Sequence, residues 1–292
     1  GFKTKFRLID SSFGEYDFPL AYAHNVSGKY DNIIAFEYEE GVRETDTMSE
    51  KEILYFRPIH WLIQFMWNYR FYYNLLRSIQ NEGVNPLEFI QFIIKNIANC
   101  RDEKLKDVFT EFHLEAEKEW FDSPEDLHKY YSQPAQLSSL KNGSFGKMNG
   151  KYIFIVSTEH KDPFKDYLFK CVQQFKNWNN IELIKKALDF DDKKIINMKS
   201  FAQGIPQKNK ITLKFDHFSY GPQNNRSVTL SLKQRKIDII SKLINQYKHE
   251  NLNVTLRKMS EYMPIKDLFY DQEVTNFRNI IEVQEDRTGF AQ

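Results

Sequence analysis

The sequence predicts an α+β protein with a predominantly helical block after a short strand remnant, followed by a smaller mixed α/β region. Nine aromatic side chains between positions 55 and 73 fall into a helical pattern. Helix-capping patterns recur between positions 49 and 132, whereas positions 210–232 contain alternating apolar and polar residues, as strands do. We therefore expect a strand-and-loop segment at 1–48, a helical domain at 49–132 and a mixed C-terminal domain at 133–292.

The first segment contains two short runs of β type, at 6–9 and 32–38, with a turn-rich loop between them. Ser49 and Glu52 then form a capping box, in which each side chain bonds the backbone of the other residue, so a helix begins here. Proline lacks an amide hydrogen and clashes with the preceding turn of a helix. We therefore expect the helix to kink or restart at Pro58.

The helix that begins near Pro58 is expected to run to about Asn81 and to stop at Gly83. Its apolar residues occupy two sides, one with Ile59, Leu62, Met66, Tyr69, Tyr73 and Leu76, the other with Trp61, Phe65, Tyr72, Leu75 and Ile79. A helix that is apolar on two sides must be surrounded by protein. It should form the centre of the fold, with its few polar side chains bonded to neighbours.

Three further helices are expected in the helical domain. Asn85, Pro86 and Glu88 supply the cap, first-turn proline and capping-box glutamate of one helix. A second covers about 102–121, and Ser123 begins a short third.

The stretch 133–150 is rich in glycine and proline and is the best internal boundary. Beyond it, the patterns predict a strand at 151–156, an antiparallel strand pair at 210–218 and 228–232, and helices at 162–178, 181–188, 234–247 and 256–263.

Composition limits the class of protein. The 41 basic and 40 acidic residues nearly balance, so nucleic acid is not an expected partner. No run approaches the roughly 20 apolar residues of a membrane span, and Cys100 and Cys171 are expected to be reduced thiols in a cytoplasmic protein. Because the chain opens within an expected strand and its first methionine is Met48, we also expect residues upstream of Gly1.

Sequence motifs for catalysis are largely missing: there is no phosphate loop, Gly-x-Gly-x-x-Gly, Gly-x-Ser-x-Gly or helical histidine pair at metal-ligand spacing. Cys171 falls on the apolar side of its helix, which favours a structural thiol. Two acidic groups are each better explained as solvated surface than as a cation site, namely Glu111, His113, Glu115 and Glu117, and Glu37, Glu39, Glu40 and Glu44.

Arg57, His60 and Gln64 are the nearest approach to a site, because spacings of three and four place them on one side of an enclosed helix. The simpler interpretation is a polar ladder that satisfies the bend at Pro58 and bonds neighbouring backbone. In the functional interpretation, Arg57 binds an anionic group, and His60 orients that group or exchanges a proton with it.

Two segments resemble the region just after the catalytic barrel in radical S-adenosylmethionine proteins that carry an N-terminal cobalamin-binding domain. They are residues 38–50, YEEGVRETDTMSE, and residues 55–60, YFRPIH. The run FRLID at 6–10 looks like the end of the barrel portion. The resemblance covers about residues 1–130.

This resemblance implies a C-terminal portion of such an enzyme, in which a helical domain lies over the barrel mouth and shapes or covers the substrate cavity. In that family a Cys-x-x-x-Cys-x-x-Cys loop holds the [4Fe-4S] cluster that binds S-adenosylmethionine, and an Asp-x-His-x-x-Gly motif binds cobalamin. Neither motif occurs here, so no catalytic, cofactor-binding or metal-binding residue is assigned to this chain. Its implied partners are the radical S-adenosylmethionine and cobalamin-binding domains of the parent chain, and an unknown substrate. The candidates for substrate contact are Arg43, Asp46, Arg57, His60 and Gln64.

Two other functions remain open. The chain could be a stand-alone helical protein-interaction module whose aromatic helix is purely core. It could also be an enzyme in its own right that uses Arg57, His60 and nearby carboxylates for acid–base chemistry without a cofactor.

Overall fold

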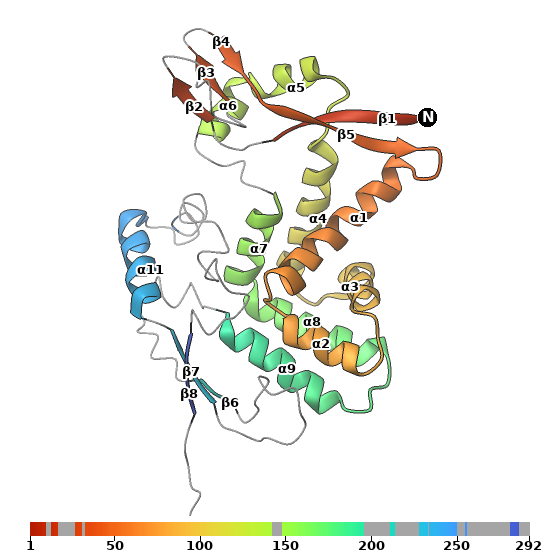
Figure 1. The fold of residues 1–292 in the computed structure, drawn as a ribbon, viewed down its shortest axis with the longest axis vertical. Helices are drawn as coiled ribbons and strands as arrows, with labels where there is room; N and C mark the ends of the chain where they lie inside the picture. The colour runs from red at the N-terminus through yellow and green to blue at the C-terminus, as the bar shows by residue number, and fades with distance from the viewer. Residues whose placement is uncertain are drawn as a thin grey trace, which may run out of the picture. The chain divides into compact units, whose positions relative to one another are not determined.

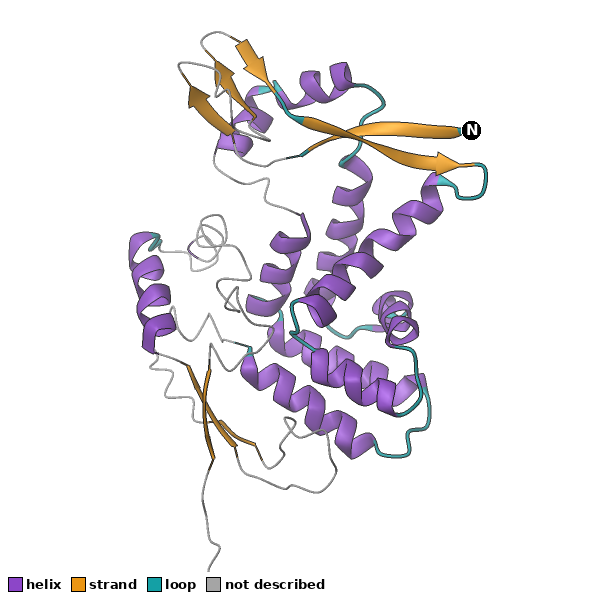
Figure 2. Cartoon of the chain, in the orientation of Figure 1, coloured by secondary structure: helices purple, strands orange, loops and turns teal. Residues whose placement is uncertain are grey.

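The computed structural model describes residues 1–9, 13–16, 27–30, 33–141, 148–195, 211–213, 228–232, 234–249, 255 and 281–285. These residues are mostly helical, with a small two-stranded antiparallel sheet near the N-terminus, as the predicted class requires (Figures 1 and 2). The chain divides into two compact units: Gly1–His60 with Asp107–Tyr152, and Trp61–Lys106 with Ile153–Gln292. The predicted segments 1–48, 49–132 and 133–292 do not coincide with these units, and as separate domains they stay predictions.

The first unit is built from strands and helices of both its stretches. Its strands are β1 (Phe2–Leu8), β2 (Phe13–Tyr16), β3 (Ser27–Tyr30), β4 (Ile33–Ala35) and β5 (Tyr38–Thr45). Its helices are most of α1 (Glu50–Leu62) and α4 (Glu103–Lys118), all of α5 (Pro124–Tyr131) and α6 (Pro134–Lys141), and the start of α7 (Met148–Thr158).

The second unit contains the remaining elements. They are the π-helix η1 (Ile63–Asn68), α2 (Tyr73–Asn81), α3 (Pro86–Lys95), the 3-10 helix η2 (Ile97–Asn99), α8 (Lys161–Phe175), α9 (Ile181–Lys194), β6 (Ile211–Leu213), β7 (Val228–Leu232), α11 (Gln234–Gln246) and β8 (Ile281–Glu285). The strand pair predicted within 210–232 is confirmed, because β6 pairs antiparallel with β7. β8 pairs with the other edge of β7 and was not predicted. The helix predicted at 256–263 lies outside the described residues.

In the first unit, β1 and β5 pair antiparallel as a two-stranded sheet. The other edge of β1 is bonded at one point, where Phe6 and Phe121 exchange two backbone hydrogen bonds of 2.8 Å. One face of the sheet carries Phe6 and Leu8, which pack on a small core. The buried residues of that core are Phe36, Leu127, Tyr131 and Leu140. This packing fixes the sheet against α5 and α6.

Helix α1 begins as predicted but passes through its proline. The Ser49 amide donates to Glu52 Oε2 at 2.8 Å, and the Glu52 amide donates to Ser49 Oγ at 3.4 Å, which completes the capping box. The predicted restart at Pro58 was wrong, because α1 continues from Glu50 to Leu62 with Pro58 inside it. The kink stays a prediction. A proline removes one helical hydrogen bond and costs about 3 kcal/mol. The cap before it and the burial of Ile59, Trp61 and Leu62 after it offset that loss.

The single helix predicted from 58 to 81 is divided in the structure. In the π-helix η1, the Tyr69 amide bonds the Gln64 carbonyl at 2.9 Å, five residues back, and the chain turns through Arg70 at φ 58° before α2 begins. Phe71 and Tyr72, just past the turn, are each 1% exposed. In a straight helix, the predicted aromatic residues would lie on only two adjacent sides. The turn after η1 lets the aromatic side chains that follow it point in other directions, where they are also buried. Burial of one predicted side is confirmed, since its residues are at most 1% exposed: Trp61, Phe65, Tyr72, Leu75 and Ile79. On the other side, Tyr69 and Tyr73 are only partly buried.

Two predictions for residues 133–156 were wrong. The glycine and proline residues of 133–150 are expected to interrupt the helical pattern, but this stretch contains helix α6. The predicted strand at 151–156 belongs to helix α7. Residues 152–158 are all buried, so this helix has no polar side to reveal a 3.6-residue period. A short apolar run that is buried all round does not distinguish a helix from a strand.

Other predicted helix starts are confirmed. Asn85 Oδ1 accepts from the Leu87 amide at 2.9 Å before α3, and Ser123 Oγ accepts from the Asp126 amide at 3.1 Å before α5. Gly83, at the end of α2, has φ 79°, which glycine adopts without strain.

In the second unit, α9 caps the start of α2. The two helices lie side by side (Figure 1), and Asp191 of α9 accepts hydrogen bonds of 2.8 Å from the Leu75 amide and from Asn74 Nδ2. Tyr72, at the N-cap of α2, offers no side-chain cap of its own. A carboxylate at a helix N-terminus satisfies free amides and complements the helix dipole. Asp191, which is 0% exposed, therefore holds α2 in place from a distant part of the sequence.

We expect Asp191→Ala to lower the free energy of unfolding by about 1–3 kcal/mol, because it leaves a buried amide without an acceptor. Asp191→Asn keeps one oxygen acceptor and should lose less. Urea unfolding followed by circular dichroism measures both. Asp166→Ala on the exposed side of α8 is the control and should change stability by less than about 0.5 kcal/mol. Equal losses for Asp191→Ala and the control would contradict the capping role.

Candidate functional site

The second face of the β1–β5 sheet is charged. Arg7 lies opposite Glu39, and Lys5 lies opposite Gly41 in the antiparallel register. Residues directly opposite one another share a face, and successive residues alternate between faces. The sheet therefore separates the apolar layer on α5 and α6 from a layer of charged side chains.

Arg43 is the extra residue of a β-bulge. Lys3 pairs with Glu44 and Thr4 pairs with Val42, so no residue of β1 lies opposite Arg43. A bulge bends its strand and redirects the extra side chain. Here that side chain is turned inward, since Arg43 is 4% exposed.

The indole of Trp120 lies directly against Gly41. A Cβ atom at Gly41 would lie only 2.5 Å from Cη2 of the indole, so a larger residue would displace the ring. The guanidinium carbon of Arg7 lies 4.9 Å from the ring centroid of Trp120, and that of Arg43 lies 4.8 Å from it. Both distances permit cation–π attraction. The glycine thus lets one ring contact two arginines.

Carboxylates join these cations from neighbouring elements. Glu119 accepts from Arg7 Nη1 through one oxygen and from Arg57 Nη2 through the other, each at 3.1 Å. Arg7 also bonds Glu39. Glu50, the first residue of α1, lies 3.0 Å from Lys5 Nζ and 3.8 Å from Arg43 Nε. We call this set the arginine–tryptophan cluster: Lys5, Arg7, Glu39, Arg43, Glu50, Arg57, Glu119 and Trp120.

Two arginines of the cluster are incompletely paired. The buried Nε atoms of Arg43 and Arg57 have no hydrogen-bond acceptor among the described residues, and neither does the indole nitrogen of Trp120. Burial lowers the pKa of both guanidinium groups, and repulsion from neighbouring arginines lowers each pKa further, while Glu119 and, for Arg43, Glu50 oppose the change. Arginine stays charged in proteins even so. The cluster therefore contains buried positive charge with free donor capacity.

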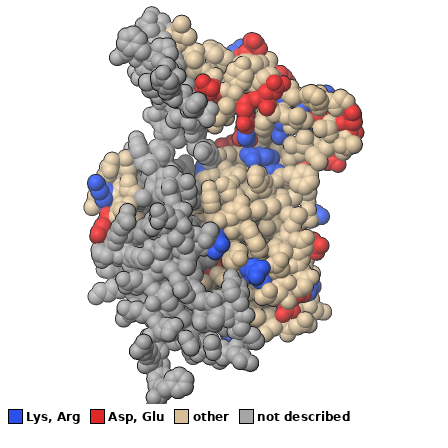
Figure 3. Space-filling model, in the orientation of Figure 1, with Lys and Arg blue, Asp and Glu red and all other residues tan. Residues whose placement is uncertain are grey.

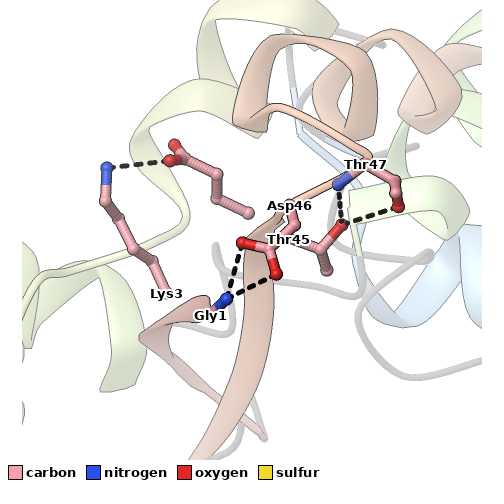
Figure 4. Close-up of polar contacts among 6 residues, drawn as sticks. Gly1, Lys3, Thr45, Asp46 and Thr47 are labelled. Atoms are coloured by element: carbon pink, nitrogen blue, oxygen red, sulfur yellow. Dashed lines mark hydrogen bonds and ion pairs between the residues drawn. The ribbon is translucent and has the colours of Figure 1, made fainter.

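The structure brings together two of the five predicted substrate contacts, Arg43 and Arg57. Asp46 lies apart from the cluster contacts, in the turn after β5, where its carboxylate accepts two hydrogen bonds of 2.5 and 2.6 Å from the Gly1 amino group (Figure 4). Its side chain is 80% exposed. Asp46 therefore has the surroundings of a surface residue.

His60 and Gln64 do not join Arg57 in a ladder. His60 is exposed on α1. Gln64 belongs to the second unit, where its Nε2 donates to the hydroxyl of Tyr69 at 2.9 Å. The spacing of three and four residues places side chains on one side of a regular α-helix, but the helix ends at Leu62 and η1 follows with a wider turn.

Sequence reasoning did not identify Arg7, Glu119 or Trp120 as members of a site. The alternation Lys3, Lys5, Arg7 was a usable signal, because residues two apart in a strand share a face. Glu119 and Trp120 follow the last residue of α4, and no local pattern links them to β1.

The two cysteines and Glu115, which could in principle carry chemistry, lie in surroundings that favour a structural role. Burial raises the pKa of the Cys171 thiol to about 12, against an opposing hydrogen bond with Tyr167, and burial also raises the pKa of Cys100. Thiols with raised pKa values form little of the reactive thiolate. Glu115 binds Lys151 Nζ and the Tyr152 hydroxyl.

The part of the chain that the structure describes has neither a cluster of metal ligands nor a membrane-spanning helix. It contains no group of three or more histidine, cysteine, aspartate or glutamate side chains placed to hold a metal ion. Likewise, no helix in it is both long enough and apolar enough to cross a membrane. The face drawn in Figure 3 carries both acidic and basic side chains among uncharged ones.

No protein-family model matches this chain, and neither a curated protein nor a solved structure matches it.

We expect Gly41→Ala to lower the free energy of unfolding by about 1–3 kcal/mol, because the new Cβ must displace the Trp120 ring. The matched test is a double-mutant cycle in which Gly41→Ala is also made in a Trp120→Ala background. There the substitution should cost clearly less, since the clashing ring has gone. Urea unfolding measures all four proteins. An equal cost of Gly41→Ala in both backgrounds would show that the contact is unimportant.

Proposed function

We propose that this chain is the accessory C-terminal portion of a radical S-adenosylmethionine enzyme of the class that carries a cobalamin-binding domain. In this proposal the chain shapes or covers the substrate cavity and performs no redox chemistry. The [4Fe-4S] cluster, S-adenosylmethionine and, where used, cobalamin belong to the domains that precede it. Residues 133–292 contribute a smaller mixed α/β region.

One observation carries the proposal. Arg43 and Arg57 both belong to the segments that resemble this family, and they lie in the same partly buried cluster although they come from β5 and α1. The resembling segments therefore fold as one piece around shared partners. A region with buried charges and a tightly packed indole is suited to form a wall, and radical chemistry requires walls that exclude water and side reactions.

The two described cysteines also support an accessory role. Cys100 is 6% exposed and Cys171 is 0% exposed, and both thiols have raised pKa values. Metal ligation requires a thiolate, so these thiols are better suited to packing than to holding a cluster.

A second candidate is a stand-alone helical protein-interaction module. Tyr55 and Phe56 favour it, because these neighbouring side chains of α1 are 37% and 47% exposed and their ring centroids lie 5.9 Å apart. Exposed aromatic side chains are common at protein interfaces.

The coding sequence upstream of Gly1 tests the main proposal. We expect it to continue in frame into a Cys-x-x-x-Cys-x-x-Cys triplet. A stop codon just upstream, with no such triplet in a neighbouring gene, would overturn the proposal.

Mixing the purified chain with the upstream domains separates the two candidates. A stable complex or restored turnover supports the accessory portion. The absence of a complex, with no change in turnover, supports the interaction module.

In the full-length enzyme, we expect Arg57→Ala and His60→Ala to lower turnover by about tenfold or more while the iron content stays at the wild-type level. His60 is exposed, so its loss should affect stability little. Lys51→Ala, also exposed on α1, is the matched control and should retain wild-type turnover. Product formation per cluster is the measurement. Wild-type turnover in both variants would show that neither Arg57 nor His60 contacts the substrate.

A further inference from the structure

Three buried donor groups of the arginine–tryptophan cluster lack acceptors among the described residues. They are Nε of Arg43, Nε of Arg57 and Nε1 of Trp120. A buried donor without an acceptor costs about 1–3 kcal/mol, and more when it is charged. Native structures contain few such groups, so three in one cluster need an explanation.

The side chains that carry the three donors belong to one network of contacts. Arg43 lies 4.8 Å from the centroid of the Trp120 ring, and Arg57 bonds Glu119, the residue next to Trp120. Arg43 and Arg57 are also near enough for their charges to repel each other. One acceptor group with several oxygens is therefore a simpler partner than three separate ones.

The buried part of the cluster has more positive than negative charge. The side chains of Arg43 and Arg57 are 5% and 16% exposed, whereas Glu119, at 23%, is the least exposed carboxylate of the cluster and is shared with Arg7. Glu39 and Glu50 are 40% and 38% exposed, so water screens their charges more strongly. Buried cations with too little compensation favour an added anion.

We propose that Arg43, Arg57 and Trp120 bind a small oxyanion group, a carboxylate or a phosphate. The group accepts from the two Nε–H donors and the indole N–H, and its negative charge compensates the two guanidinium groups. Arginine and indole donors suit this chemistry because neither can act as an acceptor. The partly exposed side chains of Arg57 and Glu119 mark where the cluster meets solvent. This site is a property of the chain itself and does not depend on the proposed parent enzyme.

Nuclear magnetic resonance of the ¹⁵N-labelled chain tests the proposal, because it observes each donor N–H directly. Inorganic phosphate and sodium acetate are titrated separately, and sodium chloride at equal ionic strength is the reference. We expect the signals of Trp120 Nε1–H, Arg43 Nε–H and Arg57 Nε–H to shift together and to saturate with one dissociation constant. Saturation by phosphate alone assigns a phosphate ligand, and saturation by acetate alone assigns a carboxylate.

The chain offers an internal control, because Trp178 Nε1–H already donates to the Val172 carbonyl at 2.6 Å and should not shift. Trp120→Phe keeps an aromatic ring but removes one donor, and Arg43→Lys keeps the charge but removes the Nε–H. Each should weaken binding by about tenfold, the worth of one hydrogen bond to a charged group. Shifts that never saturate, or that sodium chloride reproduces, would overturn the proposal. So would bound water detected at the three donors and retained in saturating phosphate and acetate.

Discussion

The contact of Trp120 with Gly41 is the constraint on which the charged layer of the first unit depends. An indole so close to the backbone of β5 leaves no room for a side chain at position 41. The ring in turn gives Arg7 and Arg43 an aromatic surface, which compensates part of the hydration that their guanidinium groups lose. Because the ring lies on the backbone, it also limits where Glu119, one residue earlier, can place its carboxylate.

That carboxylate holds distant parts of the unit together. Glu119 follows α4 and bonds Arg7 of β1 and Arg57 of α1 through its two oxygens. A partly buried pair is not strongly stabilising by itself, because desolvation opposes the attraction. Its effect is specificity, since Glu119 bonds both arginines only when all three elements are in place. The second unit uses a related device, in which Asp191 of α9 caps α2.

Local signals in the sequence predicted much of the fold. Ser49, Asn85 and Ser123 were recognised as helix caps because a cap depends on residues a few positions away. The strand predicted at 151–156 was wrong because α7 is buried on every side and shows no helical period. For the site, the sequence predicts Arg43 and Arg57 but not Glu119 and Trp120. Their role comes from tertiary contacts with strands far away in sequence, which no local pattern records.

Local structure nevertheless sets the geometry of the cluster. The turn between β5 and α1 is closed by the Thr45 amide, which donates to the Met48 carbonyl at 2.8 Å, and the capping box fixes the first turn of α1 directly afterwards. Glu50 and Arg57 are seven residues apart in α1, about two turns, so they share one side of the helix. With the start of α1 fixed, both side chains meet the charged face of the sheet. A one-residue change in the turn would rotate α1 by about 100° relative to β5 and separate these side chains from Arg43 and Glu119.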